Sequence, residues 1–183
     1  WGNEESCDAT PRSSDGQLLF LMEMVNKMKS PEHNGIWGRI ASVHNGSSLF
    51  TGDAGGGESN IRRYIIENDL LNAIVQLPNN LFYNTVITTY IWLLSNNKPV
   101  QRKGKVQLID ASLMFRKLRK NLGNKNCEFA PEHIAEIMQT YLAGQDVERQ
   151  LDAKNDPIGI ASKVFDNQDF GYYKVNIERP DRR

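Results

Sequence analysis

Two apolar stretches separated by only eight residues constrain the fold of this chain more than any other feature. Residues 70–77 (LLNAIVQL) are almost continuously apolar, and so are residues 86–94 (VITTYIWLL). Runs of this kind are typical of strands in a sheet that is covered on both faces. The connection between them is too short for a crossover helix, which takes a dozen or more residues. The two strands are therefore expected to be antiparallel neighbours.

The other elements alternate between helix and strand. Asp15 can cap a helix whose apolar residues share one face, and Pro131 and Gly144 suit the first turn and the end of another helix. Because the order begins with a helix and no GxGxxG follows a strand, we interpret the chain as the carboxyl-terminal half of a doubly wound α/β domain. The expected elements are a helix at 15–29, a strand at 36–44, a helix from 59 or 60, strands at 70–77, 86–94 and 106–109, a helix at 131–143, and a weak strand at 172–177.

Composition argues against several classes of protein. The longest apolar run, residues 18–22, is far shorter than the roughly 20 residues of a membrane helix, and no signal-like segment opens the chain. Cys7 and Cys127 lack metal-binding spacing and are expected to be free thiols, and the three histidines are scattered. We therefore predict a soluble, cytoplasmic protein without a metal site. The first residue, Trp1, suggests a polypeptide cut from a longer one.

Charge is balanced in total but not along the chain. There are 22 basic and 22 acidic residues, yet residues 98–125 hold nine basic residues and one acidic residue. A strip of this kind suits nucleic-acid phosphates, because each neutralised phosphate releases condensed counterions. The alternative is an ordinary solvated loop and helix face. The candidate DNA-binding residues are Arg102, Lys103, Arg116, Lys117, Arg119 and Lys120.

The glycine-rich segment at residues 47–59 (SSLFTGDAGGGES) is a second candidate site. Its backbone N–H groups could hold an anion ahead of a helix. It lacks the lysine of a nucleotide-triphosphate loop, which makes that function unlikely. The alternative is a surface loop that needs the flexibility of glycine.

The connection at residues 77–85 (LPNNLFYNT) is the most informative segment. It combines aromatic rings with several side-chain amides, and these groups can stack on an extruded base and hydrogen-bond to its edge. Aromatic residues in a turn are more commonly packing residues, so the segment alone leaves both interpretations open. The candidate base-binding residues are Asn80, Phe82 and Tyr83.

Residues 40–99 resemble the N6-adenine DNA methylases that serve as modification subunits of type I restriction-modification systems. The resemblance extends from DGQLLFLMEM (15–24) through FRKLRKNLGNK (115–125) to FGYYKVNIERP (170–180). In that family a Rossmann-like domain binds S-adenosylmethionine through a glycine-containing turn, and an Asn-Pro-Pro-aromatic tetrad holds the flipped adenine. Neither motif is present in this sequence. The resemblance therefore implies the part of the methylase domain that follows the tetrad.

The resemblance implies a specific division of the chain. Residues 1–110 would form the carboxyl-terminal half of a Rossmann-like methyltransferase sheet with an antiparallel last strand. Residues 111–183 would add the basic segment, a helix and an irregular tail. The helix that starts at Asp15 would help to wall the cofactor pocket, and Phe82, with Tyr83 as second choice, would flank the target base.

The resemblance also implies an activity that this chain does not complete by itself. The intact enzyme would transfer a methyl group from S-adenosylmethionine to adenine in DNA, together with a specificity subunit and a restriction subunit. We expect no catalytic residue in this chain, weak cofactor binding and no activity of the chain alone. A non-catalytic module that docks DNA or a partner is the alternative. Half of a nicotinamide-dependent dehydrogenase is disfavoured, because no acidic ribose-binding residue lies at the required offset from a glycine-rich turn.

Overall fold

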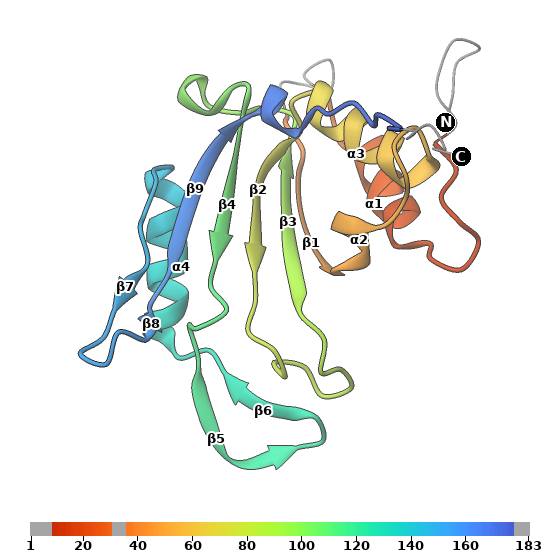
Figure 1. Cartoon of the computed structure of the whole chain (residues 1–183). Coiled ribbons are helices and arrows are strands. Elements are labelled where there is room, and N and C mark those ends of the chain that lie inside the picture. Colours follow the sequence, from red (N-terminus) through yellow and green to blue (C-terminus); the bar gives the residue numbers. More distant parts are fainter. Residues whose placement is uncertain (1–8, 31–35, 178–183) are drawn as a thin grey trace, which may run out of the picture.

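The structure is a computed structural model that describes residues 9–30 and 36–177. Its centre is a five-stranded sheet in the order β1-β3-β2-β4-β9 (Figure 1). β2 (Leu71–Gln76) and β3 (Thr89–Ser95) are antiparallel neighbours, which confirms the prediction from their short connection. The sheet is completed by β1 (Arg39–Asn45), β4 (Lys105–Asp110) and β9 (Ala161–Asp166).

The sheet is mainly antiparallel, whereas the alternating order of helices and strands suggests a parallel one. β3 pairs antiparallel with both β1 and β2, and β9 pairs antiparallel with β4. Within the described residues only β2 and β4 pair in parallel. The reason is that β3 reverses through a short loop and then lies between two strands that run the same way. As a result, the carboxyl ends of β1, β2 and β4 lie at one edge of the sheet, which we call the carboxyl edge.

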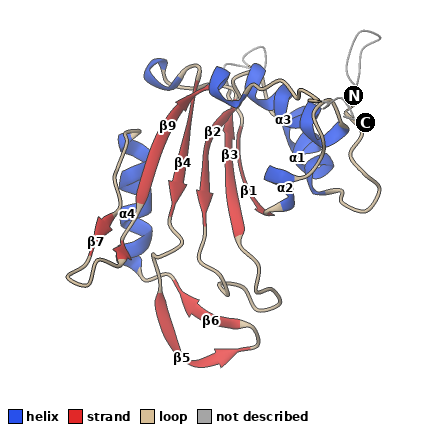
Figure 2. Ribbon diagram, viewed as in Figure 1, coloured by secondary structure: helices blue, strands red, loops and turns tan. Residues whose placement is uncertain are grey.

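Three helices lie where the sequence predicts them. α1 (Gln17–Asn26) and α3 (Gly57–Glu67) cover one face of the sheet, and α4 (Pro131–Ala143) packs on the other (Figure 2). Gly144 ends α4 with a φ of 60°, a left-handed conformation that glycine adopts at little cost. A further single turn, α2 (Ser47–Phe50), follows β1. No helix in the described ranges has both the length and the apolar character needed to cross a membrane.

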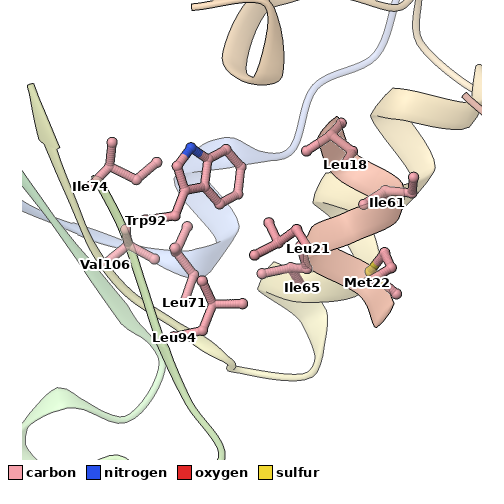
Figure 3. Close-up of a cluster of buried hydrophobic side chains, with 10 residues drawn as sticks. All are labelled: Leu18, Leu21, Met22, Ile61, Ile65, Leu71, Ile74, Trp92, Leu94 and Val106. Carbon is pink, nitrogen blue, oxygen red and sulfur yellow. The ribbon is translucent and has the colours of Figure 1, made fainter. Parts of the chain in front are cut away.

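The larger core lies between the sheet and the helices α1 and α3. Alternate strand residues point to this face, because the side-chain period of a strand is two. Trp92 of β3 belongs to this cluster, lies beside Ile74 on the side of the sheet and is only 2% exposed (Figure 3). Full burial of each large apolar side chain contributes about 1.5 to 3 kcal/mol, so this cluster is a main source of stability. The other members of the cluster are Leu18, Leu21, Met22, Ile61, Ile65, Leu71, Ile74, Leu94 and Val106.

The sequence analysis does not predict several short elements. β5 (Arg116–Leu122) and β6 (Lys125–Glu128) form an antiparallel hairpin, and β7 (Gln150–Leu151) pairs with β8 (Pro157–Ile158). The prediction of a strand at 172–177 is wrong, because the structure assigns no strand there. Instead, β9 takes the position beside β4. Two turns of 3₁₀ helix also occur, η1 (Val100–Arg102) and η2 (Asn167–Phe170).

An ion pair between a buried lysine and a partly exposed aspartate joins several connections at the edge opposite the carboxyl edge. The Lys98 side chain is 2% exposed, and its ammonium donates to Asp69 Oδ1 at 2.6 Å and to the Lys105 carbonyl at 2.8 Å. Asp69 also accepts hydrogen bonds from the Gly104 backbone N–H and the Asn167 amide. Burial lowers the pKa of Lys98, and the bond to Asp69 offsets only part of that effect. Burial acts to raise the pKa of Asp69, but its hydrogen bonds outweigh burial and leave that pKa lowered.

β1 is an edge strand of the sheet, and the side of it that faces away from β3 is unpaired among the described residues. It pairs with β3 over its whole length, and no described strand pairs with its other side. Val43, two residues before the end of β1, is 52% exposed. The outward backbone N–H and C=O groups therefore have no ladder partner within residues 9–30 and 36–177.

Candidate nucleic-acid interface

The connection between β2 and β3, residues 77–88, leaves the carboxyl edge as a loop with a fixed base. We call it the aromatic loop. Leu77 is buried, and its N–H donates to the Thr89 carbonyl at 2.9 Å. One residue further into the loop, the Thr88 hydroxyl donates to Asn79 Oδ1 at 2.7 Å. These two bonds close the base of the loop, so its tip projects from a defined position.

The three predicted base-binding residues lie in this loop in different surroundings. The Asn80 backbone has a φ of 58°, and its amide donates to the Asn124 carbonyl at 3.0 Å. Tyr83 is 60% exposed, and the Lys125 ammonium lies 5.7 Å from the centre of its ring. Phe82 is 37% exposed and has no aromatic or cationic partner among the described residues. Phe82 thus offers a partly buried ring with an accessible surface, which is what stacking on a base requires.

The β5–β6 hairpin packs against the aromatic loop. The loop runs beside the start of β6, and backbone groups, the side-chain amide of Asn80 and a lysine ammonium join the two segments (Figure 1). Contacts between residues this far apart in sequence fix the loop against the hairpin. The further bonds are Asn126 N–H to the Asn80 carbonyl at 3.1 Å, Asn124 N–H to the Tyr83 carbonyl at 3.0 Å, Lys125 Nζ to the Leu81 carbonyl at 2.9 Å and Cys127 Sγ to the Asn79 carbonyl at 3.2 Å.

Four of the six predicted DNA-binding residues lie on this hairpin, and all four are exposed. The Arg116 guanidinium is paired with Glu128 at 2.7 Å, so part of its charge is neutralised. Lys117, Arg119 and Lys120 have no acidic partner in the part of the chain that the structure describes. The fold therefore brings three cations without acidic partners among the described residues onto the same hairpin that packs against the aromatic loop.

The other two predicted DNA-binding residues lie elsewhere. Arg102 belongs to η1, where its guanidinium lies over the Tyr141 ring at 4.6 Å and donates to the Tyr141 carbonyl. Lys103 follows it and is exposed. β4 runs from this point to the carboxyl edge of the sheet, and residues 111–115 then lead to the hairpin. The basic strip seen in the sequence therefore occupies two opposite edges of the sheet.

Other parts of the chain pack closely against the glycine-rich segment. A Cβ atom on Gly57 would overlap the Thr10 carbonyl oxygen, and one on Gly52 would lie 2.9 Å from Glu58 Cβ. The Glu58 carboxylate in turn pairs with Arg12 at 3.3 Å. These contacts explain Gly52 and Gly57 as close packing, whereas a Cβ atom on Gly55 would meet nothing within 4 Å.

The sequence analysis did not predict a cluster of polar side chains that lies at the carboxyl edge. Asp15, just before α1, accepts hydrogen bonds from the Ser47 hydroxyl at 2.5 Å and from the Gln17 amide. Asn45, the last residue of β1, accepts the Ser47 backbone N–H at 2.9 Å. The bond from Ser47 is the main cause that holds the pKa of Asp15 below its ordinary value. The turn residues Asn45-Gly46-Ser47 directly after a strand are the sequence signal that could have indicated this cluster.

A cavity of about 830 Å³ opens on the face of the sheet beside α3. At its margin Asp110 and Arg149 form an ion pair at 2.8 Å. None of the residues predicted to bind a base lines it, so the cavity and the aromatic loop are separate features. Its apolar and aromatic lining includes Phe50, Tyr90, Trp92, Leu108, Phe165 and Phe170.

The metal-ligating side chains and the thiol of the described residues do not form a further candidate site. Within the described residues no group of three metal-ligating side chains comes together. Cys127 is a buried free thiol whose pKa is raised by burial. Cys7 and His33 lie outside the described residues.

Comparison with known proteins places these features in a family. The model of the N-6 DNA methylase family matches residues 3–166. The methylase subunit of the type I restriction enzyme MjaVII of Methanocaldococcus jannaschii is 37% identical over 110 residues, 60% of this chain. That of the HindI enzyme of Haemophilus influenzae is 34% identical over 155 residues, 79% of this chain. The alignments cover 18% and 31% of these relatives, so the chain spans less than a third of their length.

A solved structure shows the same fold. The type I restriction-modification methyltransferase subunit from Streptococcus thermophilus superimposes with a TM-score of 0.67 at 24% identity, over 87% of this chain and 28% of that one. The predicted fold class, a partial methyltransferase fold of mixed α/β type, is therefore confirmed, with a sheet that is mainly antiparallel. The resemblance to type I modification subunits is confirmed as well. The chain belongs to the N-6 DNA methylase family.

Proposed function

We propose that this chain is part of the methylase subunit of a type I restriction-modification system, which transfers a methyl group from S-adenosylmethionine to the N6 amine of adenine in DNA. Membership of the N-6 DNA methylase family and the names of the relatives support this proposal. The observation that carries it is the contact between the aromatic loop and the basic hairpin at the carboxyl edge. Ligands of open α/β sheets bind outside the carboxyl ends of the strands.

Within this proposal, residues 1–110 form the carboxyl-terminal half of the methyltransferase domain and residues 111–183 form an extension. Strand β9 of the extension pairs with β4, which favours an extension built onto the sheet over a loose tail. The partners are DNA, a specificity subunit that reads the DNA sequence and a restriction subunit.

The described residues do not fit a complete site for S-adenosylmethionine. The glycine-rich segment packs against Thr10 through Gly57, and its glycines come after the helical turn α2 rather than directly after strand β1. We therefore place the cofactor, and the groups that orient the adenine amine toward it, mainly outside this chain. α1 begins at the carboxyl edge beside β1, where it can form one wall of the cofactor pocket.

The chain's own contribution is to hold the DNA and the extruded base. Phe82 would stack on the flipped adenine, with Tyr83 as the second candidate and Asn80 holding the loop or the base edge. The free cations of the hairpin would contact the phosphates on either side. Stacking on an aromatic ring is worth about 1 to 3 kcal/mol per base.

We expect Phe82→Ala to weaken base flipping by roughly 5- to 150-fold in the whole methylase complex, because the extruded adenine loses its stacking partner. The measurement is permanganate oxidation of the thymine opposite the target adenine, which becomes reactive when the base pair opens. Titration of S-adenosylmethionine is the companion measurement, and its affinity should hardly change. Tyr83→Ala is the matched control with a smaller expected effect. Equal loss of flipping and of cofactor affinity would contradict the role of Phe82.

We expect the change of Lys117, Arg119 and Lys120 to Gln to flatten the salt dependence of DNA binding. The slope of log K against log salt should fall by about 0.9 for each lost phosphate contact. Arg116→Gln should change the slope less, because Glu128 already neutralises part of its charge. Lys103→Gln is the control at the opposite edge of the sheet and should leave the slope unchanged. An unchanged slope in the triple variant would make the hairpin an ordinary solvated surface.

A further inference from the structure

The cavity beside α3 has a floor that is polar at one end. Its floor is formed by β3, β2 and β4, which are neighbours in the sheet (Figure 1). Their register places Tyr90 opposite Gln76 and Gln76 opposite Asp110, so these three residues form a polar row near the carboxyl edge. Open α/β sheets bind their ligands at this edge. The row behind it is apolar and consists of Trp92, Ile74 and Leu108.

The walls of the cavity carry several aromatic rings. Phe50 comes from α2, Phe165 from β9 and Phe170 from η2. Phe165 and Phe170 contact each other edge to face, with their ring centres 5.9 Å apart. The volume of about 830 Å³ lies within the roughly 300 to 1,000 Å³ of small-molecule sites, which are likewise apolar with a few polar groups. Aromatic walls of this kind suit a planar ring.

The polar row has hydrogen-bonding capacity to spare. Among residues 9–30 and 36–177, no group bonds to the Gln76 side-chain amide or to the Tyr90 hydroxyl. Burial and then the charge of Asp110 raise the pKa of Tyr90, so its hydroxyl keeps its proton and can donate. The Asp110 carboxylate contacts Arg149 at 2.8 Å and accepts the Ser112 N–H at 2.9 Å. A carboxylate has about four lone-pair sites, so Asp110 can accept further bonds.

The charges that line the cavity cancel. Binding of a phosphate or another anion needs an excess of cations. The lining has no such excess, because it holds three basic and three acidic side chains. An uncharged ligand is therefore favoured over a nucleotide or a nucleic-acid strand. The six charged residues are Arg62, Arg149, Lys163, Asp110, Asp146 and Glu148.

We propose that this cavity binds an uncharged, planar heteroaromatic base of the guanine type, alone or as a nucleoside. One edge of guanine carries two adjacent N–H donors and, beside them, a carbonyl oxygen. Asp110 accepts from the donors, Gln76 donates to the carbonyl oxygen, and the aromatic side chains pack against the ring. Adenine presents a ring nitrogen, which is an acceptor, where guanine presents a donor to Asp110. No residue of the aromatic loop or of the β5–β6 hairpin lines the cavity, so this inference goes beyond the proposed function.

The test is calorimetric titration of guanosine into the whole methylase subunit. We expect saturable binding, which Gln76→Leu weakens about 5- to 150-fold because the carbonyl oxygen of the ligand loses its donor. Gln139→Leu is the matched control, since Gln139 is exposed on α4, and it should leave the affinity unchanged. Ala161 lines the cavity opposite Asp110, so Ala161→Phe should block binding without the loss of any core side chain. Circular dichroism verifies that each variant is folded.

Comparison of ligands tests the chemical class. Adenosine should bind about 5- to 150-fold more weakly than guanosine, because its ring nitrogen faces a carboxylate. Guanosine 5′-monophosphate should bind no more tightly than guanosine, and tighter binding would overturn the choice of an uncharged ligand. Equal affinity for adenosine would overturn the choice of guanine.

Other outcomes separate this site from the aromatic loop and from the proposed function. The absence of saturable guanosine binding, or an unchanged affinity in folded Gln76→Leu, would overturn the proposal. Phe82→Ala should not change the affinity for guanosine, and a loss there would place the ligand at the aromatic loop instead. Methyl transfer to DNA by the unaltered complex tests the proposed function without guanosine, so each idea can fail while the other holds.

Discussion

Replacement of Asp69 by asparagine is expected to lower the free energy of unfolding of this chain by about 3 kcal/mol, the low end for a broken buried ion pair, because the Asp69 side chain is 31% exposed. The change leaves the Lys98 ammonium, whose side chain is 2% exposed, without its carboxylate. Asparagine also tolerates the positive φ of 52° at this position, so backbone strain is not the cause. Urea denaturation followed by circular dichroism gives the change.

The dependence on pH distinguishes a charge effect from simple misfolding. Burial already lowers the pKa of Lys98, and loss of Asp69 lowers it further. The folded Asp69→Asn variant then releases this proton at a pH where the unfolded chain still holds it, so its stability rises with pH. The deficit should therefore shrink from neutral to alkaline pH. The control is Asp69→Asn/Lys98→Met, in which no buried charge is left alone and part of the stability returns. A deficit that is independent of pH would show that the ion pair is not its origin.

Gly123→Ala is expected to disconnect the aromatic loop from the hairpin. Gly123 has a φ of 64° in the turn between β5 and β6, and a Cβ atom there would lie 2.9 Å from the Tyr83 carbonyl oxygen. That oxygen accepts the N–H of Asn124, the next residue, so the turn cannot shift without loss of this bond. We expect a loss of about 1 to 3 kcal/mol in stability and a fall of roughly tenfold or more in DNA affinity of the whole complex.

The chain offers a matched control for backbone strain. Gly159 has a φ of 73°, but a Cβ atom there would have nothing within 4 Å. Gly159→Ala should therefore show the strain alone, with DNA affinity unchanged. If both variants lost the same DNA affinity, the contact between the loop and the hairpin would not be what DNA binding requires.

The sequence predicts those parts of the fold that depend on local pattern. The apolar runs at β2 and β3 and the short connection between them are enough to predict an antiparallel pair. The faces of α1 and α3 follow from helical periodicity, and Gly144 marks the end of α4. Each of these signals lies within one short stretch of chain.

The remaining elements depend on partners far away in the sequence. β5 (RKLRKNL) is almost entirely exposed, so it shows no alternation of apolar and polar residues that would indicate a strand. β9 becomes a strand because β4 leaves an edge free beside it. The segment at 172–177 has strand-like residues but no neighbouring strand to pair with in the structure.

The candidate site, too, could be predicted from the sequence only where it depends on local pattern. The residue types of the aromatic loop and of the basic segment are visible in the sequence, and both suggest nucleic acid. Their contact depends on bonds such as that between Tyr83 and Asn124, 41 positions apart, which no local pattern encodes. For the same reason the sequence did not separate Arg102 and Lys103 from the cations of the hairpin. The roles of all these residues stay predictions until the variants are measured.

The open side of β1 has a consequence for handling the chain in concentrated solution. Arg39 is the only residue of β1 that is charged at neutral pH, since burial lowers the pKa of His44 and keeps its imidazole neutral. In natural sheets, lysines, prolines or bulges on an edge strand prevent it from pairing with another chain. β1 has none of these gatekeepers along its length. Copies of this chain produced by themselves would therefore tend to aggregate through β1. A peptide that pairs with the open side of β1 would suppress this aggregation.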